Sequence, residues 1–118
     1  MAGATRTKAK EDFEYMIDKV LDVKEDEEFN SVIKDNKINT IPDILQLSSR
    51  LLNKMEYINS DGLSQSIPNY VDAIFCVIKQ WNLHLMEKHN LTTVDWSDTN
   101  IVNAESYDLY RTSTDFNP

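Results

Sequence analysis

Cysteine, glycine and proline are all scarce in this chain of 118 residues. The single cysteine, Cys76, excludes an internal disulfide bond and favours a reducing intracellular compartment, the cytoplasm or the nucleus. Sheet-rich folds need many turn residues, so two glycines and three prolines predict helices joined by short polar loops. The N-terminus also lacks the apolar stretch of a signal peptide.

Positive charge and long apolar runs are also in short supply. The chain has 12 Lys and Arg against 20 Asp and Glu, which gives a net charge of −8. A surface that binds nucleic acid has to neutralise phosphates with clustered basic residues. The basic residues Arg6, Lys8 and Lys10 run directly into acidic ones, so we expect no nucleic-acid binding. No run approaches the roughly 18 apolar residues of a membrane span, so no membrane partner is expected.

Motifs that would carry catalysis or bind a metal are missing as well. His84 and His89 flank Glu87, but they are five residues apart, about 140° around a helix, whereas a zinc-binding helix needs a spacing of four. Cys76 has no histidine near it in sequence, and we expect a buried or half-buried thiol. There is no glycine-rich phosphate loop. The sequence therefore predicts no enzyme, no cofactor and no metal site.

A stripe of apolar residues is the strongest positive feature. In the segment from Ile67 to His89 these residues recur in steps of three and four, which is typical of one face of an α-helix. The stripe consists of Ile67, Tyr70, Val71, Ile74, Val77, Ile78, Trp81 and Leu85. We predict a long central helix over about residues 67–89 that stops near Asn90, a residue that tolerates the left-handed conformation.

Capping signals predict shorter helices around the long one. Helices are expected over about residues 8–23 and 26–35, with further short helices that begin at Thr40, at Ser48 or Ser49, and at Asn103. Ser66 repeats the pattern of Thr40 before the long helix. Residues 58–65 are expected to form a loop.

The predicted fold class is all-α, a single helical domain of five or six helices packed around the long central helix. Its N-terminal half has SAM-like or orthogonal-bundle features. Residues 1–7 are expected to be a disordered N-terminus, residues 8–111 the helical domain, and residues 112–118 a connector or a truncated end.

The long helix has a second face that carries apolar residues. Phe75, Cys76, Leu83 and Met86 lie on or beside the side opposite the main stripe. A helix that is apolar on two sides is either central in its domain or has a partner. Two interpretations remain open at this point. Residues 94–110 cover this face, or the chain associates with itself through it.

Several short motifs resemble a known family. They are residues 41–48 (IPDILQLS), residues 53–57 (NKMEY), Asp61-Gly62, Asp95-Trp96-Ser97 and residues 107–113 (YDLYRTS). Their order resembles the N-terminal, Gag-like region of polyproteins from diatom copia-type retrotransposons, over residues 29–113. The resemblance implies a particle-forming or scaffold segment. It implies no activity, because the protease, integrase and reverse transcriptase motifs of such polyproteins are absent, and one cysteine cannot form a zinc knuckle.

The sequence thus predicts a non-catalytic domain for protein–protein interaction or assembly, with a protein partner or self-association. An alternative is a nucleic-acid-associated adaptor with a SAM-like or helix-hairpin-helix unit near residues 29–57, although that segment lacks the glycine such a hairpin uses. A small enzyme of unrecognised type is the third possibility.

Overall fold

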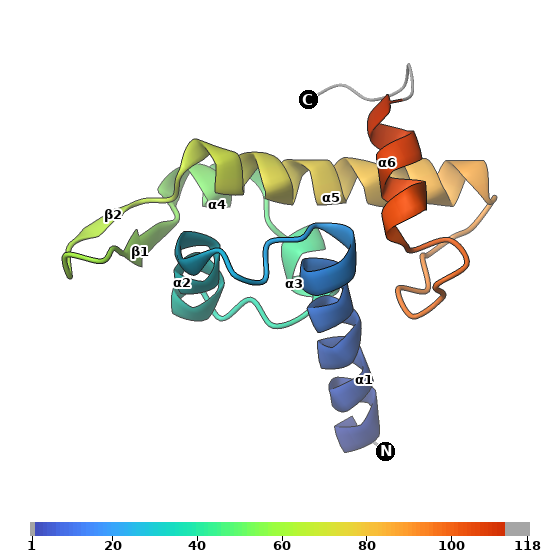
Figure 1. Cartoon of the computed structure of the whole chain (residues 1–118), viewed down its shortest axis with the longest axis horizontal. Helices are drawn as coiled ribbons and strands as arrows, with labels where there is room; N and C mark the ends of the chain where they lie inside the picture. The colour runs from blue at the N-terminus through green and yellow to red at the C-terminus, as the bar shows by residue number, and fades with distance from the viewer. Residues whose placement is uncertain (1, 113–118) are drawn as a thin grey trace.

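The long helix α5 (Asn69–Lys88) extends across the molecule, and the other elements lie along it or cross it (Figure 1). The computed structural model describes residues 2–112, with side chains from residue 8 onward. Helix α1 (Ala2–Tyr15) continues into a π-helical turn, η1 (Met16–Val20). Then come α2 (Glu27–Asp35), α3 (Ile41–Leu45), α4 (Ser49–Lys54), strands β1 (Glu56–Ile58) and β2 (Ser64–Ser66), α5, and α6 (Ala104–Thr112).

The predicted all-α fold class is wrong, because residues 56–66 form an antiparallel hairpin. Tyr57 pairs with Gln65, Glu56 with Ser66, and Ile58 with Ser64. The expected loop at residues 58–65 therefore contains parts of two strands. Strands are normally detected by alternating apolar residues. Here β1 buries only Tyr57, and β2 is exposed at every position, so no alternation was present to detect.

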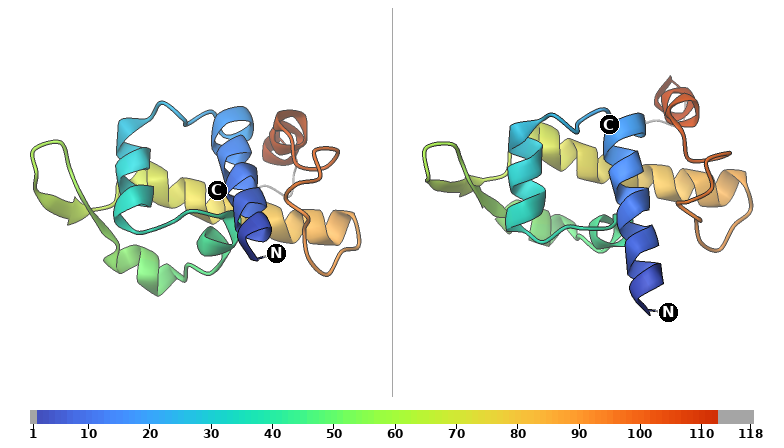
Figure 2. Two further views of the ribbon diagram at one scale, coloured as in Figure 1. Left: turned by 90° about the horizontal axis from the view of Figure 1, so that it is seen from below. Right: turned by 60° about the horizontal axis from the view of Figure 1, so that its bottom comes forward.

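The helices also do not form one bundle around a central helix. Figures 1 and 2 show that α1 and α6 cross α5 instead of running along it, while the hairpin extends from the end of the molecule away from α6. Helix α1 begins at Ala2, further toward the N-terminus than the expected start near residue 8. Thr112 ends α6, and the rest of the predicted connector lies outside the described residues.

Most of the predicted helix starts are confirmed. The Thr40 hydroxyl accepts a hydrogen bond from Asp43 N, and the Asp43 carboxylate accepts one from Thr40 N, which completes a capping box. Ser48 caps α4, and Asn103 accepts from Ser106 N at the start of α6. The exception is α5, which begins after Pro68 without a side-chain cap, because Ser66 belongs to β2.

The core follows α5 from end to end. Its buried positions are Val71, Phe75, Ile78, Trp81 and Leu85. Toward the hairpin, Phe75 packs against Phe29 of α2, with ring centroids 6.0 Å apart. Toward the other end, Trp81 meets Trp96 at 5.8 Å and Tyr107 at 5.1 Å. The predicted helix stop is confirmed, since Asn90 has a φ of 53° and Leu91 N bonds to Met86 O. Among residues 2–112 we find no helix that is both long and apolar enough to span a membrane.

Candidate functional site

A groove of about 840 Å³ lies between α1–η1 on one side and α2 with the segment after it on the other. Its apolar lining comes from both sides: Phe13 and Ile17 from the first, and Ile33 and Ile38 from the second. Phe13, Ile17 and Ile38 are also part of the hydrophobic core, so the floor of the groove is the outer edge of the core. We call these four residues the apolar floor.

Local backbone geometry brings the two halves of the floor into place. Phe13 and Ile17 are four residues apart, so they share one face of the first helical segment. On the other side, Lys37 adopts a left-handed φ of 56°, and Ile38 N donates to Ile33 O at 2.9 Å. This is the Schellman motif at the end of α2, and it typically places its two flanking apolar residues in contact.

Lysines dominate the charge around the groove. Five lysines line it against three carboxylates, from the following residues: Lys10, Lys19, Lys24, Lys34, Lys37, Glu11, Glu14 and Asp18. Asp18 lies 3.8 Å from Lys19 and 4.0 Å from Lys24. Within the part of the chain that the structure describes, Lys10, Lys34 and Lys37 form no ion pair. An acidic chain of net charge −8 therefore has a cationic groove.

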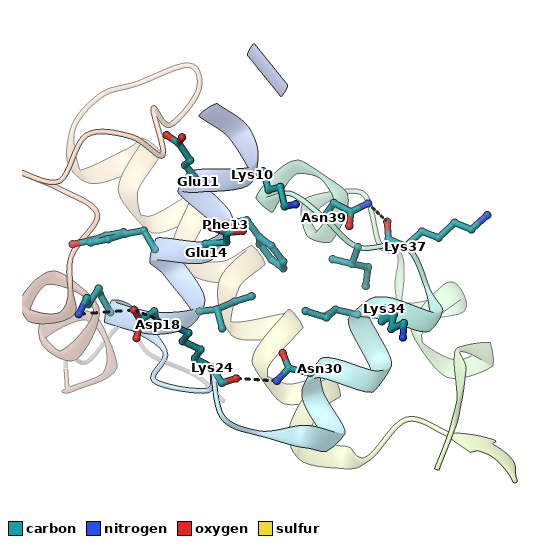
Figure 3. Close-up of a pocket in the computed structure, with 15 residues that line it drawn as sticks. Lys10, Glu11, Phe13, Glu14, Asp18, Lys24, Asn30, Lys34, Lys37 and Asn39 are labelled. Atoms are coloured by element: carbon teal, nitrogen blue, oxygen red, sulfur yellow. Dashed lines mark hydrogen bonds and ion pairs between the residues drawn. The ribbon is translucent and has the colours of Figure 1, made fainter. Parts of the chain in front are cut away.

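The close-up in Figure 3 shows how these side chains lie. Phe13 points from α1 into the space between the two helices, whereas Lys37 extends away from it. Two backbone carbonyls of the rim are held by amide side chains. Asn30 Nδ2 donates to Lys24 O at 2.8 Å, and Asn39 Nδ2 donates to Lys37 O at 3.4 Å.

The second face of α5 is less apolar than the sequence predicted. Phe75 lies in the core with no exposed surface, and Cys76 and Met86 are half-buried against that core. Leu83 alone of the four predicted residues is open, with 63% of its surface exposed. The structure therefore does not assemble these four residues into one exposed patch.

The C-terminal segment covers a different flank of α5. Trp96 and Tyr107 pack against Trp81, and the Tyr110 ring lies 4.7 Å from the His84 ring. On an α-helix, His84 lies about 100° and Trp81 about 160° around the axis from Leu83, so neither lies beside it. The exposure of Leu83 shows that residues 94–110 do not cover that part of α5.

The surroundings of Cys76 favour the protonated thiol. Burial raises the pKa of its thiol, the nearby Asp72 carboxylate raises it further, and Lys79 opposes both. The Lys79 ammonium is itself engaged, because it donates to the Leu47 carbonyl. A raised pKa lowers the fraction of the reactive thiolate at neutral pH, and the side chain packs partly buried against the core.

Sequence reasoning missed the groove. Its lysines are spread over residues 10–37, and each is indistinguishable in sequence from a solvated surface residue. Phe13, Ile17 and Ile33 lie within helices that the sequence predicted, whereas Ile38 lies outside them, and nothing in the sequence indicated a groove between two helices. Comparison of the chain with protein-family models, with curated proteins and with solved structures gives no match.

Proposed function

We propose that this protein is a non-catalytic interaction module, and that its groove docks an acidic, amphipathic helix from a protein partner. The observation that carries the proposal is the apolar floor under a lysine rim in an otherwise acidic chain. Helix-in-groove recognition uses apolar anchors along one side of the bound helix. An acidic opposite side would meet Lys10 and Lys34 at the rim.

The two parts of the groove have different tasks. Burying one leucine-sized side chain on the floor contributes about 1.5–3 kcal/mol. An exposed ion pair contributes about 0.2–1 kcal/mol. The floor therefore supplies most of the affinity, while the lysines select an acidic partner and speed its approach. The negative charge elsewhere on the chain repels the same partner from the rest of the surface.

A protein partner fits the groove better than a nucleic acid does. The floor of Phe13, Ile17, Ile33 and Ile38 matches the apolar side of an amphipathic helix. An apolar floor also gives a phosphate backbone nothing to contact. Assembly into a retroelement-like particle remains a narrower proposal that rests on the sequence resemblance alone.

A binding assay with a designed probe tests the proposal. The probe is a fluorescein-labelled helical peptide with leucine along one face and glutamate elsewhere, and its anisotropy is measured during titration with the protein. We expect saturable binding that weakens with added salt. Lys10→Glu combined with Lys34→Glu, which we call the groove variant, should weaken binding at least about tenfold, because it replaces attraction by repulsion.

Arg50→Glu is the control for non-specific effects of charge, because it makes one such charge reversal at an exposed residue outside the groove. It lies in the first turn of α4, where a carboxylate suits the helix dipole. Equal binding by wild type and the Arg50→Glu variant is expected. If the peptide does not bind, or if both variants weaken it equally, the groove is not a docking site for acidic helices.

A further inference from the structure

We propose that the groove also binds the β1–β2 hairpin of another copy of this chain. The inference rests on the proposed function, because it uses the same apolar floor and lysine rim. It goes beyond that function by naming a particular occupant and by making the protein self-associating.

The hairpin carries the exposed apolar side chains that such a contact needs. Leu63, just before β2, has 63% of its surface exposed, and Ile58 at the end of β1 has 50%. Both adjoin or lie in the turn between β1 and β2, and Figures 1 and 2 show this hairpin extending beyond the helices. A projecting tip with two apolar side chains is the shape that a groove with an apolar floor accepts.

The charge of the hairpin complements that of the groove. Residues 56–66 contain Glu56 and Asp61 and no basic residue, and both carboxylates are exposed. Glu27 and Glu28 at the start of α2 line a small cavity together with Tyr57 and Ile58, so further negative charge borders the hairpin. Docking would place these carboxylates near Lys10 and Lys34, which have no ion pair among the described residues.

The tip is held in one conformation before any contact is made. Asn59 Oδ1 accepts from Asp61 N at 2.9 Å and from Leu63 N at 3.0 Å. Asn59 N donates to Leu63 O, and Asn59 Nδ2 donates to Gln65 Oε1 at 2.8 Å. Gly62 supplies the left-handed φ of 79° that closes the turn. Because the tip is already ordered, docking costs little conformational entropy.

The hairpin is also fixed to the body of the protein. The Asp35 carboxylate accepts from Ile58 N at 2.7 Å, and Asn36 Nδ2 donates to Glu56 O at 2.9 Å. The Tyr57 hydroxyl donates to the Glu28 carboxylate at 2.9 Å. These contacts tie the outer edge of β1 to α2, and the tip is therefore a rigid projection.

The arrangement of the elements requires that the occupant come from a second copy. The groove lies on the side of α2 that faces α1–η1. Figures 1 and 2 show the hairpin on the other side of α2, so the hairpin does not reach the groove of its own chain. The groove and the hairpin are different surfaces, and each copy offers one of each. Such a contact is heterologous and links copies head to tail.

Sedimentation velocity at increasing protein concentration tests the inference with the full chain. Wild type should form species larger than a monomer, and added salt should shift the equilibrium toward the monomer. Ile58→Thr combined with Leu63→Ser, which we call the hairpin variant, removes the apolar tip without touching a buried side chain. The hairpin variant and the groove variant should each raise the concentration needed for association at least about tenfold.

Mixing the two variants gives the sharpest result. The groove of the hairpin variant and the hairpin of the groove variant are both intact. An equimolar mixture should therefore form a 1:1 complex at a concentration at which neither variant associates alone. Leu83→Ser is the matched control, because Leu83 and Leu63 are equally exposed. This variant should associate like wild type.

Three results would overturn the inference: a wild-type protein that stays monomeric, variants that fail to complement each other, or association that is lost only in Leu83→Ser. Circular dichroism melting of each variant shows whether it is folded. A monomeric wild type whose groove still binds the acidic peptide would contradict the self-association but not the proposed function. If the peptide also fails to bind, the result contradicts both the self-association and the proposed function.

Discussion

At the scale of single residues, a few polar and left-handed positions set where the chain changes direction. Lys37 adopts the left-handed conformation at the end of α2 and so returns Ile38 to the side of Ile33. Asn90 does the same at the end of α5. Asn59 organises the hairpin tip through its amide side chain. None of these residues contributes much apolar surface, yet they decide where the groove and the hairpin tip lie.

Asp12 gives a pH-dependent prediction at this scale. Burial raises the pKa of its carboxyl, Lys8 lowers it, and Asp95 and Glu11 raise it. The folded state therefore binds this proton more tightly than the unfolded state, and ionisation of Asp12 above its folded-state pKa costs stability. Asp12→Asn should raise the free energy of unfolding at pH 7 by up to about 0.5 kcal/mol.

The gain should disappear below pH 3.8, the ordinary pKa of the group, where the carboxyl is protonated in both states. Urea unfolding of wild type and variant at pH 7 and at pH 3 measures both values. A loss of stability at pH 7 would mean that attraction to Lys8 outweighs burial, contrary to this account.

At the scale of elements, α5 shows what the sequence could predict and what it could not. Periodicity correctly located a long helix and most of its buried residues, and Asn90 correctly marked its end. The predicted stripe included Ile74, which is only partly buried, and left out Phe75, which is fully buried. Apolar residues occur on both sides of this helix. Which side is buried depends on the elements that pack against it, and the sequence of the helix alone does not identify them.

The faces of α5 can be separated by two matched truncations. Phe75→Ala removes a side chain with no exposed surface that packs on Phe29, and it should lower the free energy of unfolding by about 3–5 kcal/mol. Leu83→Ala shortens a side chain that is 63% exposed, and it should change stability by no more than about 0.5 kcal/mol. Chemical denaturation measures both. Similar losses for the two variants would show that Leu83 is buried in solution.

The short elements divide into those with a local signal and those without one. Thr40, Ser48 and Asn103 were predictable as helix caps, because capping depends on residues within three positions. The hairpin was not predictable, because its one buried residue, Tyr57, is fixed by contacts with α2 that are distant in sequence. The groove was missed for the same reason. Its floor joins residues 13 and 17 to residues 33 and 38 through the tertiary fold.

At the scale of the whole molecule, charge is distributed unevenly. The chain has a net charge of −8, yet five of its lysines line one groove, and the projecting hairpin is acidic. A protein with one cationic concave surface and one anionic convex surface is suited to bind other chains in a fixed orientation. Because apolar contact supplies most of the affinity, salt should weaken these interactions without abolishing them.

The central claim, that the groove is the docking surface, is tested most directly by mapping the contact on the protein. The measurement is a titration of ¹⁵N-labelled protein with the unlabelled acidic amphipathic peptide, followed through the backbone amide shifts. We predict that the perturbed amides cluster along the groove, in residues 10–19 and 30–39. Perturbations centred on Leu83 and Met86 of α5, or none at all, would contradict the account.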